Sequence, residues 1–100
     1  PGRIKVEEQQ ALDEYKIRYS DIDLNGHVNS VKYIEHILDL FPMEWFRQKT
    51  VKRFEVAYVA ESYYGDTLSF YRQQISENEF DIEVKKNGQK VVVRSKVISN

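Results

Sequence analysis

The chain has 100 residues, with 15 Lys and Arg, 16 Asp and Glu and no cysteine, and its net charge is −1 at pH 7. This length predicts one domain with one core and too little chain for a deep substrate cavity as well. The absence of cysteine excludes disulfides, thiolate zinc ligands and a cysteine nucleophile. The balanced charge argues against a nucleic-acid partner. No apolar stretch approaches the ~20 residues that a membrane-spanning helix requires, so no membrane partner is expected.

The first thirteen residues are polar and precede the first patterned segment. The chain begins at Pro1 rather than at a methionine, so we expect it to have been processed or cut from a longer protein. We interpret residues 1–13 as an interdomain linker or N-terminal arm, and residues 14–100 as the folded domain.

Residues 14–20 alternate between apolar and polar side chains with a period of two. Tyr15, Ile17 and Tyr19 share one face, and charged residues lie between them. This alternation predicts a half-buried strand. A loop is expected over residues 21–28, because acidic residues, asparagine and glycine follow.

A helix is predicted from about Asn29 to Phe41, where Pro42 prevents regular continuation. Its polar arc holds Lys32, Glu35, His36 and Asp39. Its apolar arc holds Val31, Tyr33, Ile34, Ile37, Leu38, Leu40 and Phe41. The apolar arc spans roughly 180°, whereas a surface helix buries a stripe of about 100°. The pattern therefore predicts a helix enclosed by a curved sheet.

Residues 43–48 are interpreted as a short turn-rich connection, and four strand-like runs follow. The runs cover residues 51–60, 67–74, 80–85 and 90–98. Asn87-Gly88 is a strong hairpin signal, because both residues tolerate positive φ. The order predicts an α+β hot-dog fold, in which a curved antiparallel sheet of about five strands wraps around one long helix. In the competing arrangement, an open sheet with the helix across one face, the helix would be more one-sided.

The densest polar segment of the chain lies just before the predicted helix. It contains Asp21, Asp23, Asn25, His27 and Asn29. A helix start offers free backbone N–H groups and a partial positive charge, which together can stabilise a developing oxyanion.

Three interpretations of this segment compete. Aspartate and asparagine are common helix caps, and Gly26 provides a turn. The first half of the segment also matches a calcium loop, but Lys32 stands where the bidentate glutamate is required, and a strand precedes it. The third interpretation is acid–base catalysis by His27 with a nearby carboxylate. Spacing excludes calcium and leaves capping and catalysis open.

Three further polar residues have ordinary explanations as well as functional ones. His36 lies on the polar arc and is interpreted as a solvated histidine. Glu61 follows an apolar strand end and is expected to be exposed, but it becomes a candidate general base if the fold brings it beside His27. Ser62 has no adjacent histidine, and nothing favours a Ser/His/Asp triad over a turn serine.

Residues 18–34, RYSDIDLNGHVNSVKYI, resemble the signature of the acyl-acyl-carrier-protein thioesterases, plant and bacterial enzymes that release fatty acids from the carrier. The resemblance covers roughly residues 15–74 well and the remaining strands loosely. Members of this family carry two hot-dog domains in tandem, and the present sequence resembles the C-terminal one. The family's acyl-chain pocket lies mostly in the N-terminal domain, so this chain alone is expected to have little activity.

The resemblance implies that the site residues are Asp23, Asn25, His27 and Glu61. It implies that water attacks the thioester carbonyl, with either Glu61 or Asp23 as general base. Asn25 and His27 would position the water, the carbonyl or the leaving thiol. The backbone N–H groups of Val28 and Asn29 are the candidates for polarising the carbonyl.

Plant members usually have cysteine where this chain has Ser62, so any role of Ser62 is minor and does not involve a thiol. No metal and no cofactor are implied. The expected partners are acyl carrier protein, a fatty acyl thioester, and either an N-terminal hot-dog domain or a second copy in a homodimer. Carrier proteins are acidic, so a basic docking surface is expected. Its candidates are Arg3, Lys5, Lys49, Lys52 and Arg53.

The resulting expectation is hydrolysis of fatty acyl thioesters on acyl carrier protein, which releases free fatty acid and ends fatty acid biosynthesis. The expected location is the bacterial cytoplasm or, for a plant protein, the plastid stroma. Two alternatives stay open, namely a non-catalytic acyl-binding or dimerisation module and a stand-alone acyl-CoA thioesterase.

Overall fold

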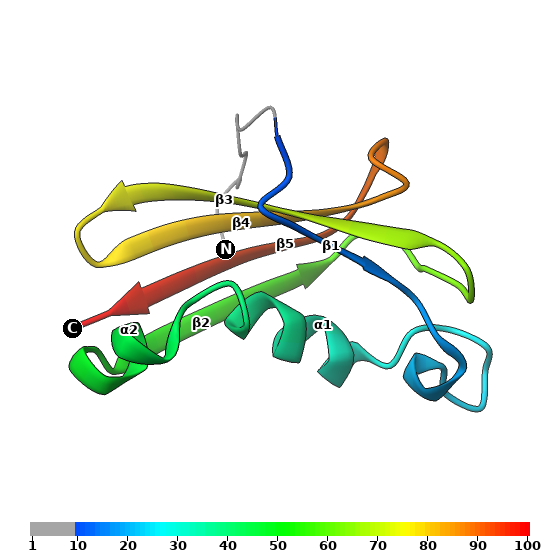
Figure 1. The fold of residues 1–100 in the computed structure, drawn as a ribbon, viewed down its shortest axis with the longest axis horizontal. Coiled ribbons are helices and arrows are strands. Elements are labelled where there is room, and N and C mark those ends of the chain that lie inside the picture. The colour runs from blue at the N-terminus through cyan, green and yellow to red at the C-terminus, as the bar shows by residue number, and fades with distance from the viewer. Residues whose placement is uncertain (1–9) are drawn as a thin grey trace.

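A five-stranded antiparallel sheet carries one main helix across one of its faces in the computed structural model, which describes residues 10–100 (Figure 1). The elements are β1 (Asp13–Lys16), a 3₁₀ turn (Tyr19–Asp21), α1 (Ser30–Leu38), α2 (Met43–Gln48), β2 (Val51–Tyr58), β3 (Thr67–Ser76), β4 (Glu79–Lys86) and β5 (Lys90–Ser99). The strand order is β1-β3-β4-β5-β2, so β1 and β2 form the two edges.

The β4–β5 hairpin turns where the sequence predicts it. Asn87 and Gly88 have φ values of 55° and 69°, a region that asparagine and glycine enter at low cost. Further along the pair, a bulge places Val92 outside the regular register. The carbonyl of Val92 accepts hydrogen bonds from the backbone N–H groups of Val59 and Ala60 at 2.8 and 3.2 Å, which fixes the chain just after β2.

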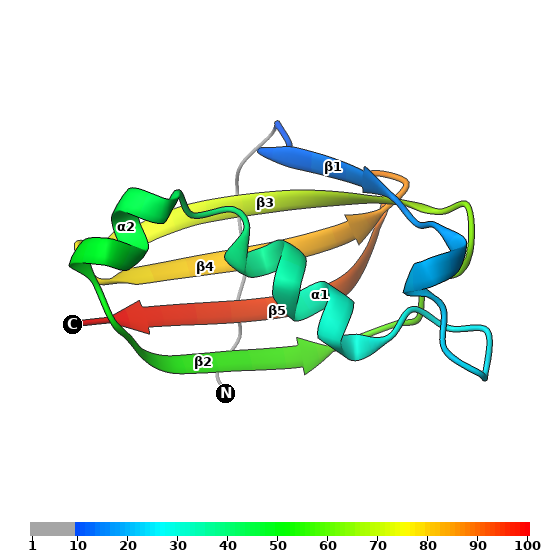
Figure 2. The same cartoon turned by 60° about the horizontal axis from the view of Figure 1, so that its bottom comes forward.

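The core lies between α1 and the sheet. Figure 2 shows how α1 lies across the sheet. Tyr33 and Ile37 of α1 are buried against alternate residues of the central strands. The sheet side of this core includes Leu68, Phe70, Phe80, Ile82, Val84, Val93 and Val97. Alternate side chains of a strand point to opposite faces, so this face is apolar while the acidic residues of β4 lie on the other.

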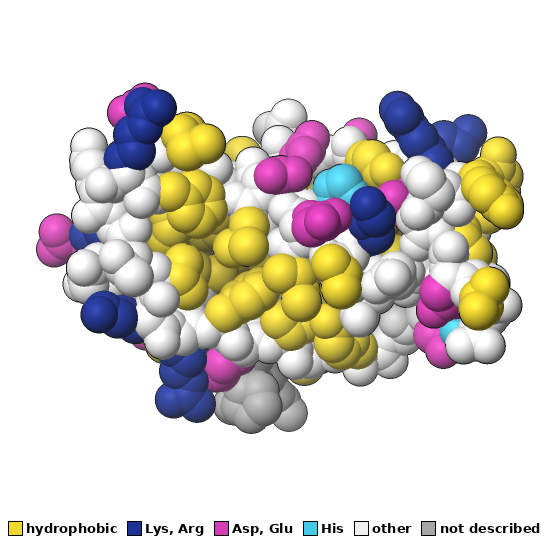
Figure 3. All heavy atoms as spheres, turned by 90° about the horizontal axis from the view of Figure 1, so that it is seen from below, with side chains coloured by type: hydrophobic (Ala, Val, Ile, Leu, Met, Phe, Trp, Pro, Cys, Tyr) yellow, Lys and Arg dark blue, Asp and Glu magenta, His cyan; other side chains and the backbone are white. Residues whose placement is uncertain are grey.

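One flank of α1 stays open within the described part of the chain. Val31 is 53% exposed, and Ile34 and Leu38 are only half-buried. Figure 3 shows a band of apolar side chains on the face that carries α1, α2 and β2. Exposed apolar residues of these elements include Val31, Met43, Phe46 and Tyr58. The sheet therefore covers one side of the helix, and the wide apolar arc exceeds what this chain alone buries.

The first predicted strand is shorter than the alternation suggests. Strand β1 ends at Lys16, and Tyr19 is 86% exposed, because the chain enters the 3₁₀ turn. The predicted linker also ends earlier than expected, because the backbone N–H of Leu12 bonds to the carbonyl of Phe70 at 2.7 Å and β1 begins at Asp13. Residues 1–9, with Arg3 and Lys5, lie outside the described residues.

The predicted turn-rich connection over residues 43–48 is wrong, because these residues form α2. Pro42 stands at its N-cap, and the Trp45 ring packs 4.6 Å from the Phe41 ring. A helix this short has no readable period, so tertiary packing decides it. Helix α1 ends at Leu38 rather than Phe41, and the Arg72 guanidinium binds the carbonyl of Leu40 at 2.6 Å.

Candidate active site

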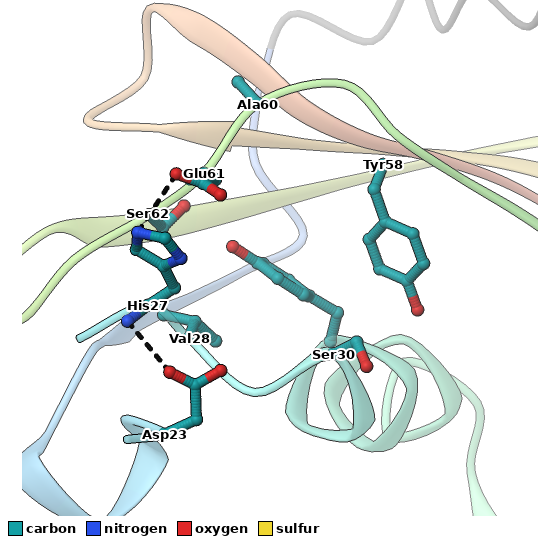
Figure 4. Close-up of a pocket in the computed structure, with 9 residues that line it drawn as sticks. Asp23, His27, Val28, Ser30, Tyr58, Ala60, Glu61 and Ser62 are labelled. Atoms are coloured by element: carbon teal, nitrogen blue, oxygen red, sulfur yellow. Dashed lines mark hydrogen bonds and ion pairs between the residues drawn. The ribbon is translucent and has the colours of Figure 1, made fainter. Parts of the chain in front are cut away.

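The loop that precedes α1 meets the segment that follows β2. A bridge between Ile22 and Val28 closes the loop, and the N–H of Val28 donates to the carbonyl of Ser62 at 3.1 Å. This backbone hydrogen bond joins two segments that are distant in the sequence. Glu61, the neighbour of Ser62, thereby lies next to His27 (Figure 4).

His27 and Glu61 form the contact that makes Glu61 a candidate general base. The Nε2 atom of His27 lies 3.2 Å from Oε2 of Glu61, and the side chains are 37% and 57% exposed. The hydroxyl of Tyr63 donates to the same Glu61 oxygen at 3.3 Å. Two effects raise the pKa of Tyr63: desolvation is the larger, and the hydrogen bond to Glu61 is the second. The hydroxyl of Tyr63 therefore stays protonated as a donor. The pair is open enough to meet a substrate and a water molecule.

Asp23 shapes the loop that holds His27. Its Oδ1 atom accepts the backbone N–H groups of Asn25 at 2.9 Å and His27 at 3.2 Å. The backbone N–H of Asp23 donates to the carbonyl of His27 at 2.9 Å, and Gly26 turns the chain with φ of 80°. This self-bonded turn is a frequent use of aspartate, and here it fixes where the His27 backbone lies.

The buried carboxylate of Asp21 holds the start of the loop through hydrogen bonds, a role that the sequence analysis missed. It is only 2% exposed, and its Oδ2 atom accepts the Tyr15 hydroxyl at 2.7 Å and the Arg18 backbone N–H at 2.8 Å. The hydrogen bond to Asp21 is the main cause that raises the pKa of Tyr15. No sequence signal separates Asp21 from Asp23, because both lie in the same polar segment.

The expected backbone donors are already in use. The N–H of Val28 binds the carbonyl of Ser62, and the N–H of Asn29 binds the carbonyl of Asp21 at 2.9 Å. Neither is free to polarise a substrate carbonyl, so this part of the prediction is not supported. Asn29 instead caps α1, and its Oδ1 atom accepts the N–H of Val31 at 2.9 Å. Helix capping and a candidate site therefore coexist in one segment.

A pocket of about 230 Å³ opens between the loop, α1 and the end of β2. It is lined by Asp23, His27, Val28, Ser30, Tyr33, Tyr58, Ala60, Glu61 and Ser62. Figure 4 shows His27 and Glu61 on one side and Tyr58 on the other. Asn25 is exposed and does not line the pocket. The volume falls below the ~300 Å³ at which pockets enclose whole drug-sized ligands, so it suits a reacting group rather than a fatty acyl chain.

Two buried hydroxyls lie at this pocket, and neither forms a hydrogen bond of good geometry within the described residues. They are the hydroxyls of Tyr33 and Ser62, whose residues are 4% and 1% exposed. Burial raises the pKa of Tyr33, and a hydrogen-bond interaction with the Ser62 hydroxyl lowers it in part. A buried unpaired hydroxyl costs about 1–3 kcal/mol. The sequence analysis placed Tyr33 in the core, and the one available signal was a tyrosine in an otherwise apolar arc.

His36 is not the solvated histidine that its place on the polar arc predicts. Its ring lies 4.0 Å from the Tyr15 ring and 6.0 Å from the Phe70 ring, and its Nε2 atom is buried. Strand β1 pairs beside β3 and covers this part of α1. Within residues 10–100, no group of three or more His, Cys, Asp or Glu side chains has a metal-binding arrangement.

Three comparisons identify proteins that are similar to this chain. The family model described as "Acyl-ACP thioesterase C-terminal domain" matches residues 4–98. The crystal structure of an acyl-ACP thioesterase from Bacteroides thetaiotaomicron is 62% identical, with a TM-score of 0.96 over 100% of this chain and 41% of that chain. The dodecanoyl-[acyl-carrier-protein] hydrolase, chloroplastic, of Cinnamomum camphora is 36% identical over 44 residues, which are 44% of this chain and 12% of that protein.

More distant structures share the fold. The 12:0-ACP thioesterase from Umbellularia californica is 20% identical, with a TM-score of 0.83 over 100% of this chain and 39% of that chain. The 1,4-dihydroxy-2-naphthoyl-CoA thioesterase Slr0204 from Synechocystis is 15% identical, with a TM-score of 0.69 over 87% of this chain and 77% of that chain. The present chain thus spans well under half the length of each acyl-ACP relative, and its hot-dog fold is confirmed.

No helix within residues 10–100 has the length and apolar character to cross a membrane. The sequence motif, the five-stranded sheet that packs on α1 and the family match over residues 4–98 lead to one conclusion. The chain belongs to the acyl-ACP thioesterase family, and it corresponds to the C-terminal domain of that family.

Proposed function

We propose that this domain hydrolyses fatty acyl thioesters held on acyl carrier protein and releases free fatty acid, which ends fatty acid synthesis. The observation that carries the proposal is the contact of 3.2 Å between His27 Nε2 and Glu61 Oε2 at the mouth of the pocket. A histidine and a carboxylate within reach of one reacting group are the parts that water activation requires. The family relatives are named as thioesterases and as an acyl-carrier-protein hydrolase, which supports this substrate class.

In the proposed reaction Glu61 is the general base, because it contacts His27 at the pocket, whereas Asp23 binds the backbone of its own loop through Oδ1. Glu61 takes a proton from water as the water oxygen attacks the carbonyl carbon. The tetrahedral intermediate collapses and the C–S bond breaks. The proton passes through His27 to the leaving thiolate, so the products are a carboxylic acid and the carrier thiol. Asn25, exposed on the loop, positions the carrier-side part of the substrate.

The acyl chain needs a surface that this domain does not enclose. The pocket holds about 230 Å³, and apolar side chains of α1 and β2 remain exposed beside it. Within residues 10–100, β2 pairs only with β5, so its outer edge is free to pair with another strand. We propose that a second hot-dog domain, in the same chain or in a second copy, covers this face. Slow hydrogen exchange along β2 in the full-length protein would support this, and rapid exchange would contradict it.

The carrier docks near β2 in this proposal. Of the three described basic candidates, Lys49 bonds to Asn78 at 2.9 Å and Arg53 pairs with Glu55. Lys52 is exposed, and its side chain makes no ion pair or hydrogen bond within residues 10–100.

The identity of 62% to a bacterial protein supports the bacterial cytoplasm as the proposed location of this protein.

The test uses the full-length protein with acyl carrier thioesters as substrate. Glu61→Gln and His27→Ala are each expected to lower kcat by about 100-fold or more, because general acid–base catalysis contributes roughly that much. The matched control is Glu77→Gln, which removes the charge of an exposed carboxylate in the β3–β4 turn. The control variant is expected to keep wild-type turnover.

Three outcomes would overturn the assignment. Undiminished hydrolysis in both site variants would exclude these residues as the catalytic pair. Tight binding of acyl carrier without product release would favour the non-catalytic module. A clear preference for CoA thioesters over carrier thioesters would favour an acyl-CoA thioesterase.

A further inference from the structure

Hydrolysis of a thioester needs hydrogen-bond donors at the carbonyl oxygen, because that oxygen becomes negatively charged as water attacks. The two backbone donors expected from the sequence, at Val28 and Asn29, already bind protein carbonyls. The side chain of Asn25 lies outside the pocket lining. Other groups around the pocket must therefore hold the carbonyl oxygen.

The lining residues that carry hydroxyl donors are Ser30, Tyr33, Tyr58 and Ser62, of which Ser30 and Tyr58 are exposed. The hydroxyls of Tyr33 and Ser62 are buried, belong to residues that line the pocket, and interact with each other, but neither forms a hydrogen bond of good geometry in the described part of the chain. Buried hydroxyls are nearly always paired in folded proteins. Two unpaired ones in the same pocket as His27 and Glu61 indicate a place where a ligand atom completes the hydrogen bonds.

We propose that the Tyr33 hydroxyl donates the principal hydrogen bond to the thioester carbonyl oxygen, and that the Ser62 hydroxyl donates a second one. This inference rests on the proposed thioester hydrolysis and assigns the oxyanion-binding groups within it. As the water oxygen bonds to the carbonyl carbon, the π electrons move to the carbonyl oxygen and both hydrogen bonds shorten. They lengthen again when the C–S bond breaks and the carbonyl of the acid re-forms.

The surroundings suit donors rather than a base or a nucleophile. Burial raises the pKa of Tyr33, so its hydroxyl keeps its proton in the working range of the enzyme. The Ser62 hydroxyl has no histidine or carboxylate bonded to it, and a serine nucleophile needs such a base within reach.

The experiment compares Tyr33→Phe and Ser62→Ala with wild type in the full-length protein, using an acyl carrier thioester. Tyr33→Phe removes only one oxygen atom, and kcat is expected to fall about 100-fold with KM nearly unchanged, as when one oxyanion donor is lost. Ser62→Ala is expected to give a smaller loss. The melting temperature should not fall in either variant, because neither lost hydroxyl formed a hydrogen bond of good geometry. Tyr64→Phe, at an exposed tyrosine outside the pocket, is the matched control.

A second measurement is independent of turnover. In a ketone analogue, a methylene group replaces the thioester sulfur, and the infrared band of its ¹³C-labelled carbonyl reports hydrogen bonding directly. The band is expected to lie at higher frequency in Tyr33→Phe than in wild type. An unchanged band, or a kcat within twofold of wild type in Tyr33→Phe, would overturn the inference. Failure of the proposed hydrolysis would show differently, as no release of free fatty acid by the wild-type protein.

Discussion

Two groups of charged and polar side chains in this molecule differ in how completely they are paired. On the outer face of β4 and β5, Lys96 Nζ lies 2.6 Å from Glu79 and 2.9 Å from Asp81. Arg94 Nε lies 3.4 Å from Glu83 on the same pair of strands. Each of these carboxylates has a cation opposite it, which is the condition for burying Asp81 and Glu83 as deeply as they are.

The pocket shows the opposite condition. His27 and Glu61 contact each other but stay partly exposed, while the hydroxyls of Tyr33 and Ser62 are buried without a hydrogen bond of good geometry. The paired group on the outer face stabilises the sheet and leaves nothing for a ligand. The pocket keeps unpaired groups at some cost in stability, as binding and catalytic sites do. The following predictions test this division, from the largest expected effect to the smallest.

Asp21 is an exception to the separation between paired groups that stabilise the fold and unpaired groups of the pocket. Its carboxylate is paired, and yet it supports the loop of the candidate site. Asp21→Ala leaves the Tyr15 hydroxyl and the Arg18 N–H without their acceptor. We expect a loss of about 2–3 kcal/mol in the free energy of unfolding, together with lower kcat, because the loop that holds His27 loosens. Thermal unfolding and carrier-thioester assays measure the two effects. Wild-type values for both would show that Asp21 supports nothing.

Lys96→Met tests the paired group on the outer face. The change leaves Glu79 and Asp81 without their shared cation, and the free energy of unfolding should fall by about 1–3 kcal/mol, a range reduced because Lys96 is partly exposed. The rate of thioester hydrolysis should stay at wild type below the melting temperature. A variant that loses activity while keeping its stability would contradict the proposed separation.

The pH dependence of the free energy of unfolding of Lys96→Met tests whether the charge of Lys96 stabilises the sheet. Hydrogen bonds to Glu79 and then Asp81 raise the pKa of Lys96 above its ordinary value of 10.5. The unfolded chain releases this proton first, so the stabilisation is fully present below pH 10.5 and declines as pH rises through the folded pKa. The stability gap between wild type and Lys96→Met should therefore narrow in strongly alkaline solution. A gap that stays constant with pH would mean that packing alone is lost.

Lys52→Glu should give the smallest effect. The side chain of this exposed residue on β2 has no partner within residues 10–100. Reversing its charge should therefore leave the free energy of unfolding unchanged. We expect KM for acyl carrier to rise about two- to fivefold at low salt, with the difference disappearing at high salt, as for a charge at the rim of an interface. A salt-independent KM would remove Lys52 from the docking surface.

Local patterns account for most of the fold. The alternation in the strands after residue 50, the start of the helix near Asn29 and the turn at Asn87-Gly88 all appear in the structure where the sequence predicts them. Errors arise where a neighbour overrides the local pattern. Residues 43–48 form a helix because Trp45 packs on Phe41, and β1 stops early because the Asp21 carboxylate captures the Arg18 N–H.

The candidate site shows the same limit. The polar loop and Glu61 are recognisable from residue type and from the family resemblance, whereas their contact depends on a backbone bond between Val28 and Ser62. The burial of His36 behind β1 and the unpaired hydroxyl of Tyr33 have no local signature. A histidine on a polar arc looks the same in sequence whether or not a strand covers it.

The sequence by itself determined the class of chain, the order of the strands and of the main helix, the Asn87-Gly88 turn and the polar loop before α1, because composition, side-chain period and backbone preferences are properties of neighbouring residues. Only the tertiary structure decided that Glu61 reaches His27, that the N–H groups of Val28 and Asn29 are occupied, and that Tyr33 and Ser62 are left unpaired beside them. Those facts depend on which surfaces meet when α1 packs on the sheet, because hydrogen-bond partners distant in the chain are assigned by packing.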